Sequence, residues 1–362
     1  MVPLLLLAAL GGYHFEVKHD ELVVTKGKQR ARLAQAMDLV RVKVDDKARA
    51  VDIDVEDVSC DGSQHYRWTF GQLDARLENT TAFGLHKKRD FKRAAQGFAR
   101  AVAADPTWNV AAYNLASAHQ LRGDKRAATA ALAPWLAAEP IATYVKVTTD
   151  PELAPLLGEP ELAAVRSKQP GNVALTATGE LTGGVAYAAN RKLLAVVRKE
   201  ASWGACSFTN RLEIYDRTGV LVASTAIVNW DETDTDCSGG VLKSAKGAIA
   251  TRSAQLSTML ANLGFNQAAT EPGTLKTDTL KNGDVKHRLQ FPANKLGVVS
   301  MRESGTASVL RSNTVLATGK VLDSLTAGIY VGDVNAIIVW SIRAGREGCE
   351  GSDPTQVTII QL

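Results

Sequence analysis

The residues best suited to hold a metal ion form an acidic run, Asp231–Gly240. Within it, Asp234, Asp236 and Ser238 place oxygen-bearing side chains at alternate positions. Convergent oxygens of this kind are what the hard cation Ca²⁺ requires. Ala245, however, stands where a calcium loop of this spacing needs a bidentate glutamate. We therefore interpret the run as a solvated acidic loop, and a calcium site at Asp234, Asp236 and Ser238 is the alternative.

The four cysteines, Cys60, Cys206, Cys237 and Cys349, are even in number and lie far apart in the chain. Their spacing does not form the CxxC pairs of zinc sites. We therefore expect disulfides, as in a protein that folds in an oxidising compartment, and their connectivity stays open. Four free thiols in a reducing cytosol are the alternative.

Catalytic motifs are missing from the sequence. The histidines form no HExxH or other paired-ligand spacing, and there is no GxSxG, SxxK or GxxxxGK[ST] motif. Gly179–Gly184 is interpreted as a turn rather than a nucleotide loop. We thus predict no catalytic residue and no cofactor. The alternative is a hydrolase or carbohydrate-binding protein with its site in the C-terminal β domain. There Trp203, Trp230 and Trp340 could stack on a ligand, although such tryptophans are more often part of a core.

Composition and charge narrow the range of partners. The chain has 362 residues, 45% of them hydrophobic and 22% charged, which is typical of a folded globular protein. Its formal net charge of +4 comes from acidic and basic residues that are interleaved along the chain. Because no polybasic stripe is available to neutralise phosphates, nucleic acid is not an expected partner. Beyond the first residues, no apolar run approaches the ~18 residues of a membrane-spanning helix.

The first twelve residues, Met1–Gly12, form an uncharged apolar run that ends in small residues. This pattern is similar to the core of a secretory signal peptide and predicts a periplasmic or extracellular protein. The run lacks a preceding Lys or Arg and is shorter than the usual ~15 to 30 residues. Alternatively, the start codon is wrongly assigned or the run is a buried first strand. The alternative location is the cytoplasm.

Residues 13–74 alternate apolar and polar side chains with the period of a half-buried strand. The clearest case is a hairpin formed by residues 40–44 and 51–56. Its pattern predicts three cross-strand pairs: Val44 with Val51, Lys43 with Asp52 and Arg41 with Asp54. Opposite charges would then lie over a valine-rich face and stabilise the sheet.

A helical pattern with an internal repeat of 34 residues begins at Ala75. Three anchor positions recur, with Ala94, Phe98 and Pro106 repeated as Ala128, Leu132 and Pro140. The first is where only a small side chain fits between two helices, the second fills the core, and the proline ends a helix. The segments Ala112–Ala116 and Gly123–Asp124, placed on these anchors, resemble the tetratricopeptide (TPR) repeat. The expected repeats are 75–108 and 109–142, with a degenerate third unit up to residue 166.

The resemblance implies that ligands bind along the first helix of each repeat. In this sequence the corresponding residues are Asn79, Phe83, His86, Lys87, Tyr113, Ser117, Gln120 and Leu121. Such aromatic and amide side chains suit an extended peptide, so a protein or peptide partner of unknown identity is expected. Together with the apolar run Met1–Gly12, the resemblance predicts an exported interaction or scaffold protein without catalysis. The alternative is that the flanking β segments cover these residues, which then bind nothing.

A Pro-Gly segment at residues 167–172 marks the expected boundary of a β-rich domain, 173–362. Three blocks in it join an asparagine to an apolar strand and predict repeated hairpins: Asn190–Val197, Asn294–Ser300 and Asn335–Ser341. One helix is expected at 249–263, with Ile249, Leu256, Met259, Leu260 and Leu263 on its buried face. A sandwich, a curved sheet and a propeller-like array all remain open. The fold class predicted for the whole chain is α+β.

Overall fold

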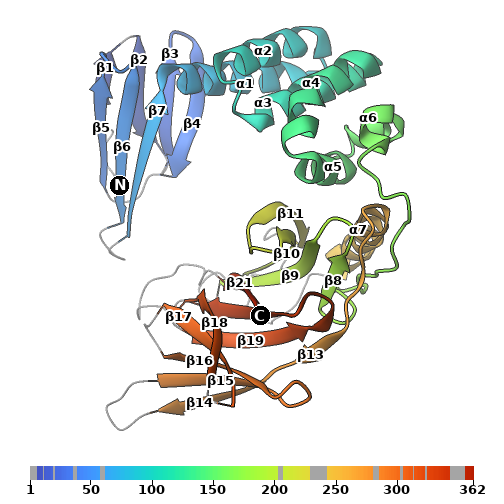
Figure 1. The fold of residues 1–362 in the computed structure, drawn as a ribbon. Helices are drawn as coiled ribbons and strands as arrows, with labels where there is room; N and C mark the ends of the chain where they lie inside the picture. Colours follow the sequence, from blue (N-terminus) through green and yellow to red (C-terminus); the bar gives the residue numbers. More distant parts are fainter. Residues whose placement is uncertain are drawn as a thin grey trace. The chain divides into compact units, whose positions relative to one another are not determined.

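The computed structural model shows a chain that is mostly β (Figure 1). It describes residues 6–10, 12–18, 21–35, 39–57, 62–202, 207–228, 243–279, 285–301, 305–312, 314–322, 324–342 and 355–362. Strands account for 42% and helices for 34%, and the described strands form five antiparallel sheets. The predicted α+β class is therefore wrong. Helices α1–α6 are confined to residues 70–163, while antiparallel sheets build the chain on both sides of them.

The chain divides into two compact units. Unit 1 comprises Met1–Ala138 and Asp150–Glu161, and unit 2 comprises Glu139–Thr149 and Leu162–Leu362.

Unit 1 begins with two sheets that share one apolar core. The first has the order β1-β2-β3-β4, and the second has the order β5-β6-β7. Their strands are β1 (Leu6–Leu10), β2 (Tyr13–Lys18), β3 (Glu21–Lys26), β4 (Gln29–Gln35), β5 (Leu39–Asp45), β6 (Ala50–Asp57) and β7 (Gly62–Thr69). Phe15 and Val24 of one sheet and Ile53 of the other lie in the same buried cluster, together with Leu73 and Leu77 of the first helix.

The predicted register of the β5–β6 hairpin is confirmed. Val44 pairs with Val51, Lys43 with Asp52 and Arg41 with Asp54. Val51, Ile53 and Val55 are buried, so the alternating apolar residues do form the core face of this sheet.

Four helices follow in antiparallel order: α1 (Phe70–Lys87), α2 (Phe91–Ala104), α3 (Asn109–Leu121) and α4 (Lys125–Ala138). Thr69 and Gln72 form a capping box that fixes the start of α1, and Asp90 caps α2. The repeat anchors Ala94, Phe98, Ala128 and Leu132 are all fully buried. The small side chains of Ala94 in α2 and Ala128 in α4 allow the neighbouring helices to approach closely. Three short elements come next, α5 (Pro140–Thr149), the 3₁₀ helix η1 (Ala154–Gly158) and α6 (Pro160–Ala163).

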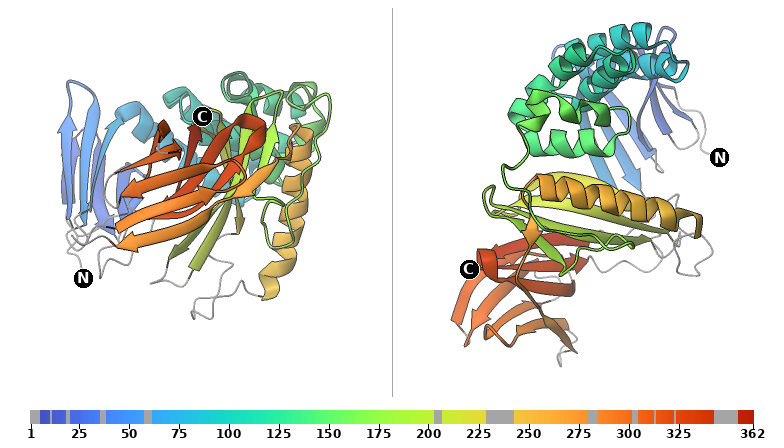
Figure 2. Two further views of the ribbon diagram at one scale, coloured as in Figure 1. Left: turned by 60° about the horizontal axis from the view of Figure 1, so that its bottom comes forward. Right: turned by 90° about the vertical axis from the view of Figure 1, so that its right-hand side faces the viewer.

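Unit 2 contains three stacked sheets (Figures 1 and 2). The upper sheet contains β11 (Leu221–Val228), β10 (Ser207–Asp216), β9 (Leu193–Ser202), β8 (Val185–Ala188) and β12 (Asn266–Gln267) in that order. The middle sheet contains β13 (Thr270–Pro272), β19 (Ser324–Val331), β20 (Ala336–Ile342) and β21 (Thr355–Gln361). The lower sheet contains β14 (Thr274–Thr279), β15 (Val285–Phe291), β16 (Leu296–Met301), β17 (Thr306–Arg311) and β18 (Thr314–Lys320).

The stacking follows from the unbroken apolar run of β20. Ile338 packs with Val196 and Val357 between the upper and middle sheets, whereas Ile337 packs with Val298 between the middle and lower sheets. A strand that is apolar on both faces needs cover on both sides. The α+β prediction failed at this point, because it did not treat the apolar run of β20 as a strand buried between two further sheets.

Helix α7 (Lys243–Asn262) packs against β11 and α5. The residues predicted for its buried face are all buried in the structure: Ile249, Leu256, Met259, Leu260 and Leu263. The prediction for this face is therefore confirmed.

The three asparagine blocks form one hairpin in each stacked sheet, as predicted: β8–β9, β15–β16 and β19–β20. Each hairpin turn contains a residue with positive φ, at Lys192 (56°), Lys295 (52°) and Asn335 (50°). Turns with a left-handed residue fit the right-handed twist of the strands they join.

Candidate functional site

Helices α1 and α3 bring together most of the residues predicted to bind a ligand. Asn79, Phe83, His86 and Lys87 follow one another at helical spacing on α1, and Ser117, Gln120 and Leu121 do so on α3. Two hydrogen bonds join the rows: Asn114 Nδ2 donates to Asn79 Oδ1 (2.8 Å), and His86 Nε2 lies 3.3 Å from Ser117 Oγ. We call the surface formed by these seven residues, Asn114 and Glu152, which contacts His86 and Ser117, the α1–α3 face.

The centre of this face is a polar cluster of three residues. His86 Nε2 lies 3.3 Å from Glu152 Oε2 as well as 3.3 Å from Ser117 Oγ, and the Ser117 hydroxyl donates to Glu152 Oε2. Ser117 is 5% exposed, whereas the Glu152 side chain is 41% exposed. Glu152 thus presents a carboxylate at the surface while its other contacts anchor it to both helices.

The cluster does not have the geometry of a serine hydrolase site. In such a site the serine and the acid contact opposite nitrogens of the histidine ring, so that the acid orients the base that deprotonates the serine. Here both groups lie near Nε2, and Ser117 gives its proton directly to Glu152. The arrangement can bind and orient a polar group, but it does not activate Ser117 as a nucleophile in the manner of that mechanism.

Aromatic side chains surround His86. The Phe83 ring stacks on it with 5.9 Å between centroids, and Phe91 and Phe98 meet it edge-on at 5.2 and 6.2 Å. Lys87 Nζ lies 5.1 Å from the centre of the Phe83 ring. Phe83 is 42% exposed and Leu121 is 39% exposed, which is high for such large apolar side chains.

One predicted residue, Tyr113, lies off this face, and two residues of the face, Asn114 and Glu152, are not among those predicted. Tyr113 is buried, so its side chain belongs to the helical core. Asn114 takes its place, because it lies three residues before Ser117 and contacts Asn79. A count at helical spacing back from Ser117 would have found Asn114. Glu152 follows α5 and carries no sequence signal that ties it to α1 or α3.

Gln120 adds an unused acceptor. Its Oε1 atom is buried and makes no hydrogen bond with any described residue. Because a buried carbonyl without a partner is unfavourable, a donor from a bound molecule would stabilise it.

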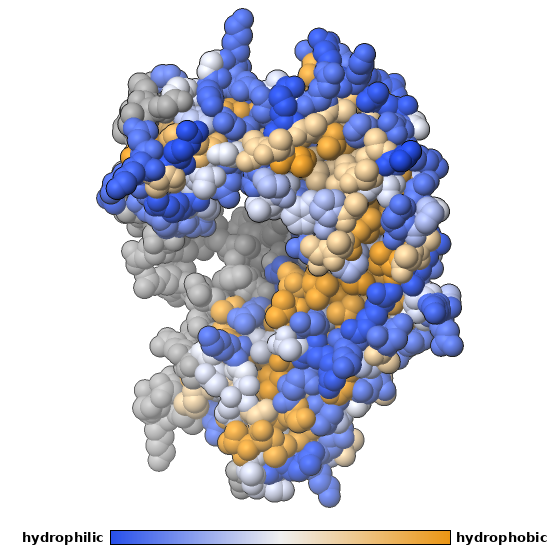
Figure 3. Space-filling model, turned by 45° about the horizontal axis from the view of Figure 1, so that its top comes forward, coloured by the Kyte–Doolittle hydropathy of each residue, from blue (hydrophilic) through white to orange (hydrophobic). Residues whose placement is uncertain are grey.

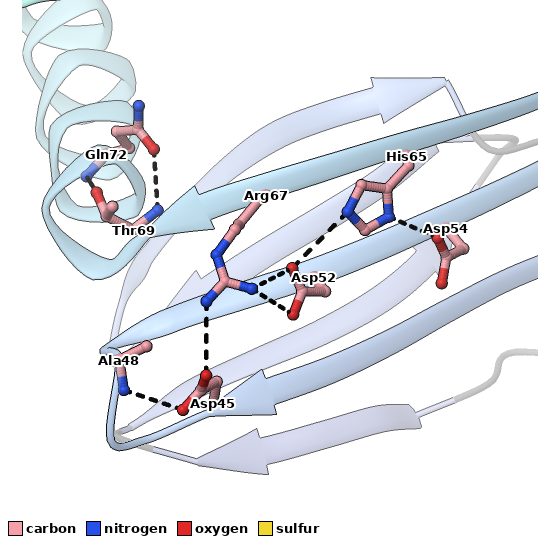
Figure 4. A network of polar contacts seen from close by, with 8 residues as sticks. All are labelled: Asp45, Ala48, Asp52, Asp54, His65, Arg67, Thr69 and Gln72. Atoms are coloured by element: carbon pink, nitrogen blue, oxygen red, sulfur yellow. Dashed lines mark hydrogen bonds and ion pairs between the residues drawn. The ribbon is translucent and has the colours of Figure 1, made fainter.

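The outer side of the β5-β6-β7 sheet carries a second polar network (Figure 4). Arg67 Nη1 donates to Asp52 at 2.8 Å, and His65 Nδ1 lies 2.7 Å from Asp54 Oδ1. The Ala48 amide donates to Asp45 and, with Arg67, holds the pKa of that carboxyl below its ordinary value. The acids of β6 therefore have polar partners on β7: Arg67 forms an ion pair with Asp52, and the His65 ring contacts Asp54.

A buried ion pair lies in the upper sheet of unit 2. Arg198 Nε donates to Glu213 Oε1 at 2.8 Å, and the Tyr215 hydroxyl donates to Glu213 Oε2 at 2.6 Å. Glu213 is only 2% exposed. Burial, together with the bond to Glu213, raises the pKa of Tyr215 above its ordinary value. Every oxygen of the carboxylate thus has a partner, as a buried charge requires.

Trp340 lines a pocket of about 650 Å³ in unit 2. Its walls are mainly apolar and include Val197, Leu275 and Ile329, while Glu180 and Lys199 form an ion pair in the lining. A β-bulge interrupts β19 between Leu325 and Ala327, and the Thr326 hydroxyl at this point donates to the Trp340 carbonyl at 3.2 Å. The volume suits a small molecule.

Several predicted site residues lie outside the part of the chain that the structure describes. They are the calcium candidates Asp234, Asp236 and Ser238, the cysteines Cys60, Cys206, Cys237 and Cys349, and the tryptophans Trp203 and Trp230. Among the residues that are described, no group of three or more His, Cys, Asp or Glu side chains is arranged to hold a metal ion.

The helices in the same part of the chain are all too short or too polar to span a bilayer.

Hydrophobic residues on the side of the molecule drawn in Figure 3 form several patches separated by hydrophilic residues. Hydrophobicity alone therefore does not distinguish a binding surface on this side.

No model of a protein family, no curated protein and no solved structure matches this chain.

Proposed function

We propose that the chain is a non-catalytic binding protein whose α1–α3 face binds an extended segment of a partner protein. The observation that carries the proposal is the close association of exposed apolar side chains with anchored polar ones. Phe83 and Leu121 are exposed, and His86, held by Ser117 and Glu152, lies against Phe83. An extended peptide offers the matching groups, since its apolar side chains alternate with backbone donors and acceptors.

Each polar group of the face has a complement in such a ligand. The Glu152 carboxylate accepts hydrogen bonds from backbone N–H groups, and Lys87 donates to a carbonyl or carboxylate. Phe83 and Leu121 contribute apolar contact, and aromatic side chains are frequent hot spots of protein interfaces. The repeat of 34 residues and the antiparallel pairs α1–α2 and α3–α4 support the further proposal that this segment is a TPR-type binding module.

The test is a peptide-array screen of the full-length chain, followed by affinity measurements on the best peptides. Phe83→Ala and Leu121→Ala are expected to weaken binding by about tenfold each, corresponding to more than 1 kcal/mol per hot spot. Arg93→Ala is the matched control, because Arg93 is an exposed residue of α2 that lies outside the face. Peptides that bind with equal affinity to all three variants would place the interaction elsewhere.

Export to the periplasm or the extracellular space belongs to the same proposal and rests on the apolar run Met1–Gly12. Intact mass of the protein from its host, before and after reduction and alkylation, tests it. Loss of the apolar run and a mass increase from two reduced disulfides are expected. A full-length chain with four alkylatable thiols would contradict export.

A second candidate function is small-ligand binding in the Trp340 pocket, of the carbohydrate or hydrolase-substrate class. The specific observation that favours it is that Trp340, Thr326 and the Glu180–Lys199 ion pair line the same pocket. The apolar face of a sugar ring can stack on the indole while its hydroxyls reach the charged pair. A glycan-array signal that Trp340→Ala removes from a folded protein would support this candidate over the first.

A further inference from the structure

The lower sheet of unit 2 has an unusual outer face. In an antiparallel sheet with one face in the core, the other face is normally polar. The inner face of this sheet is buried against the middle sheet through residues such as Phe291 and Val309. The outer face nevertheless carries apolar side chains on three adjacent strands, and Val315 is 55% exposed.

These side chains line a groove of about 970 Å³. Strand register places Met301 beside Lys286, Val299 beside Arg288 and Leu310 beside Val315. We call the surface formed by these six residues the β15–β18 groove. Its cations lie along β15, and its apolar residues lie along β16, β17 and β18.

The charge of the groove selects the sign of its ligand. Besides Lys286 and Arg288, Lys295 of the β15–β16 turn lies in the wider lining, and the described lining contains no carboxylate. Asp278 of β14 forms an ion pair with Arg288, yet the Arg288 Nε atom is buried and has no hydrogen-bond partner among the described residues. Register places Asp278 beside Lys286, but the Lys286 ammonium group forms no hydrogen bond or ion pair with Asp278 or any other described residue. An anionic group would therefore meet two cationic residues, Lys286 and Arg288, at this end of the groove.

We propose that the β15–β18 groove binds a long-chain carboxylate, with the carboxylate at Lys286 and Arg288 and the hydrocarbon chain over Met301, Val299, Leu310 and Val315. An acyl chain has no polar groups that need partners on an apolar surface. An extended peptide would lay its amide groups over the same apolar side chains, where the backbone of β15, β16 and β17 is already paired with neighbouring strands. A second copy of the chain would bring the same cations against one another across a two-fold axis.

Calorimetric titration of the full-length protein with hexadecanoate below its micelle concentration tests the proposal. One saturable site is expected. Lys286→Gln is expected to lower the affinity about tenfold, because it removes one charge-assisted contact. Lys320→Gln is the matched control, since Lys320 is an exposed lysine of the same sheet that does not line the groove, and it is expected to leave the affinity unchanged. The methyl ester of the same acid is expected to bind at least tenfold more weakly.

Three outcomes would overturn the proposal. One is the absence of saturable binding by the folded protein. Another is equal loss of affinity in the two lysine variants, which would indicate a general charge effect. The third is a monomer–dimer equilibrium, seen by sedimentation, that Leu310→Ser abolishes, which would assign the face to contact between two copies. Leu310→Ser is otherwise expected to weaken hexadecanoate binding while the protein keeps its circular dichroism spectrum.

Discussion

Gly97 of α2 and Ala82 of α1 pack so closely that a β-carbon on Gly97 would lie 2.7 Å from the β-carbon of Ala82. Carbon atoms do not approach to this distance without a shift of the backbone. Gly97→Ala is therefore expected to push the two helices apart and lower the free energy of unfolding by about 1–2 kcal/mol, despite the better helix propensity of alanine. Chemical denaturation followed by circular dichroism measures this change.

Gly84→Ala in α1 is the matched control. A β-carbon at Gly84 would meet no atom within 4 Å. Alanine at this position is expected to raise the free energy of unfolding by about 0.5–1 kcal/mol, because glycine loses more backbone entropy on folding. If both substitutions stabilised the chain, the close contact between Gly97 and Ala82 would be refuted.

The Arg198–Glu213 pair is expected to be strongly coupled. Arg198→Met leaves the carboxylate of Glu213, which is 2% exposed, without its cation. The expected loss is about 3–5 kcal/mol, whereas the double change Arg198→Met with Glu213→Leu is expected to recover most of it. A double-mutant cycle by denaturation gives the coupling. Additive losses in the double variant would show that the two side chains do not depend on each other.

The raised pKa of Tyr215 predicts that the folded protein loses stability in alkali. Burial and the bond to Glu213 raise the pKa of Tyr215 in the folded state above its ordinary value, so the folded chain keeps this proton where the unfolded chain releases it. The stabilisation is complete below the unfolded pKa of about 10 and falls as the pH rises above it. Unfolding free energies measured from about pH 8 to 11 should decline less steeply in Tyr215→Phe. Identical slopes in the two proteins would contradict the assignment.

The ion pairs on the β5-β6-β7 sheet are expected to contribute little to stability. Arg67 is 51% exposed at its contact with Asp52, so water and salt screen the pair. Asp52→Asn should therefore lower the free energy of unfolding by less than about 1 kcal/mol, and the difference should shrink at high salt. A loss of several kcal/mol that persists at high salt would show that the network is more than a surface feature.

The candidate binding face was largely predictable, because helical spacing fixes which residues share a side of one helix. The resemblance to the TPR repeat implies that His86 and Ser117 belong to the binding side, and helical spacing then relates each of them to the other residues of its own helix. Glu152 is outside both kinds of inference, because it joins the cluster through the path of the chain after α5, and no local pattern encodes that path. The sequence pattern pairs the acids Asp52 and Asp54 with Lys43 and Arg41 of β5, whereas in the structure Asp52 forms an ion pair with Arg67 and Asp54 contacts the His65 ring of β7. A hairpin pattern relates β6 only to β5, whereas β6 is a central strand that also has β7 as a neighbour.

The sequence by itself determined the local features of this protein: the register of the β5–β6 hairpin, the buried face of α7 and the three asparagine hairpins. Each depends on side-chain alternation and turn residues within a few positions of one another. Only the tertiary structure decided that the chain is mostly β, because that depends on which apolar faces meet. Ile337 and Ile338 are adjacent in sequence yet pack against different sheets, and the strands that cover them come from distant parts of the chain. Such long-range pairing is a property of the whole fold, which no local pattern contains.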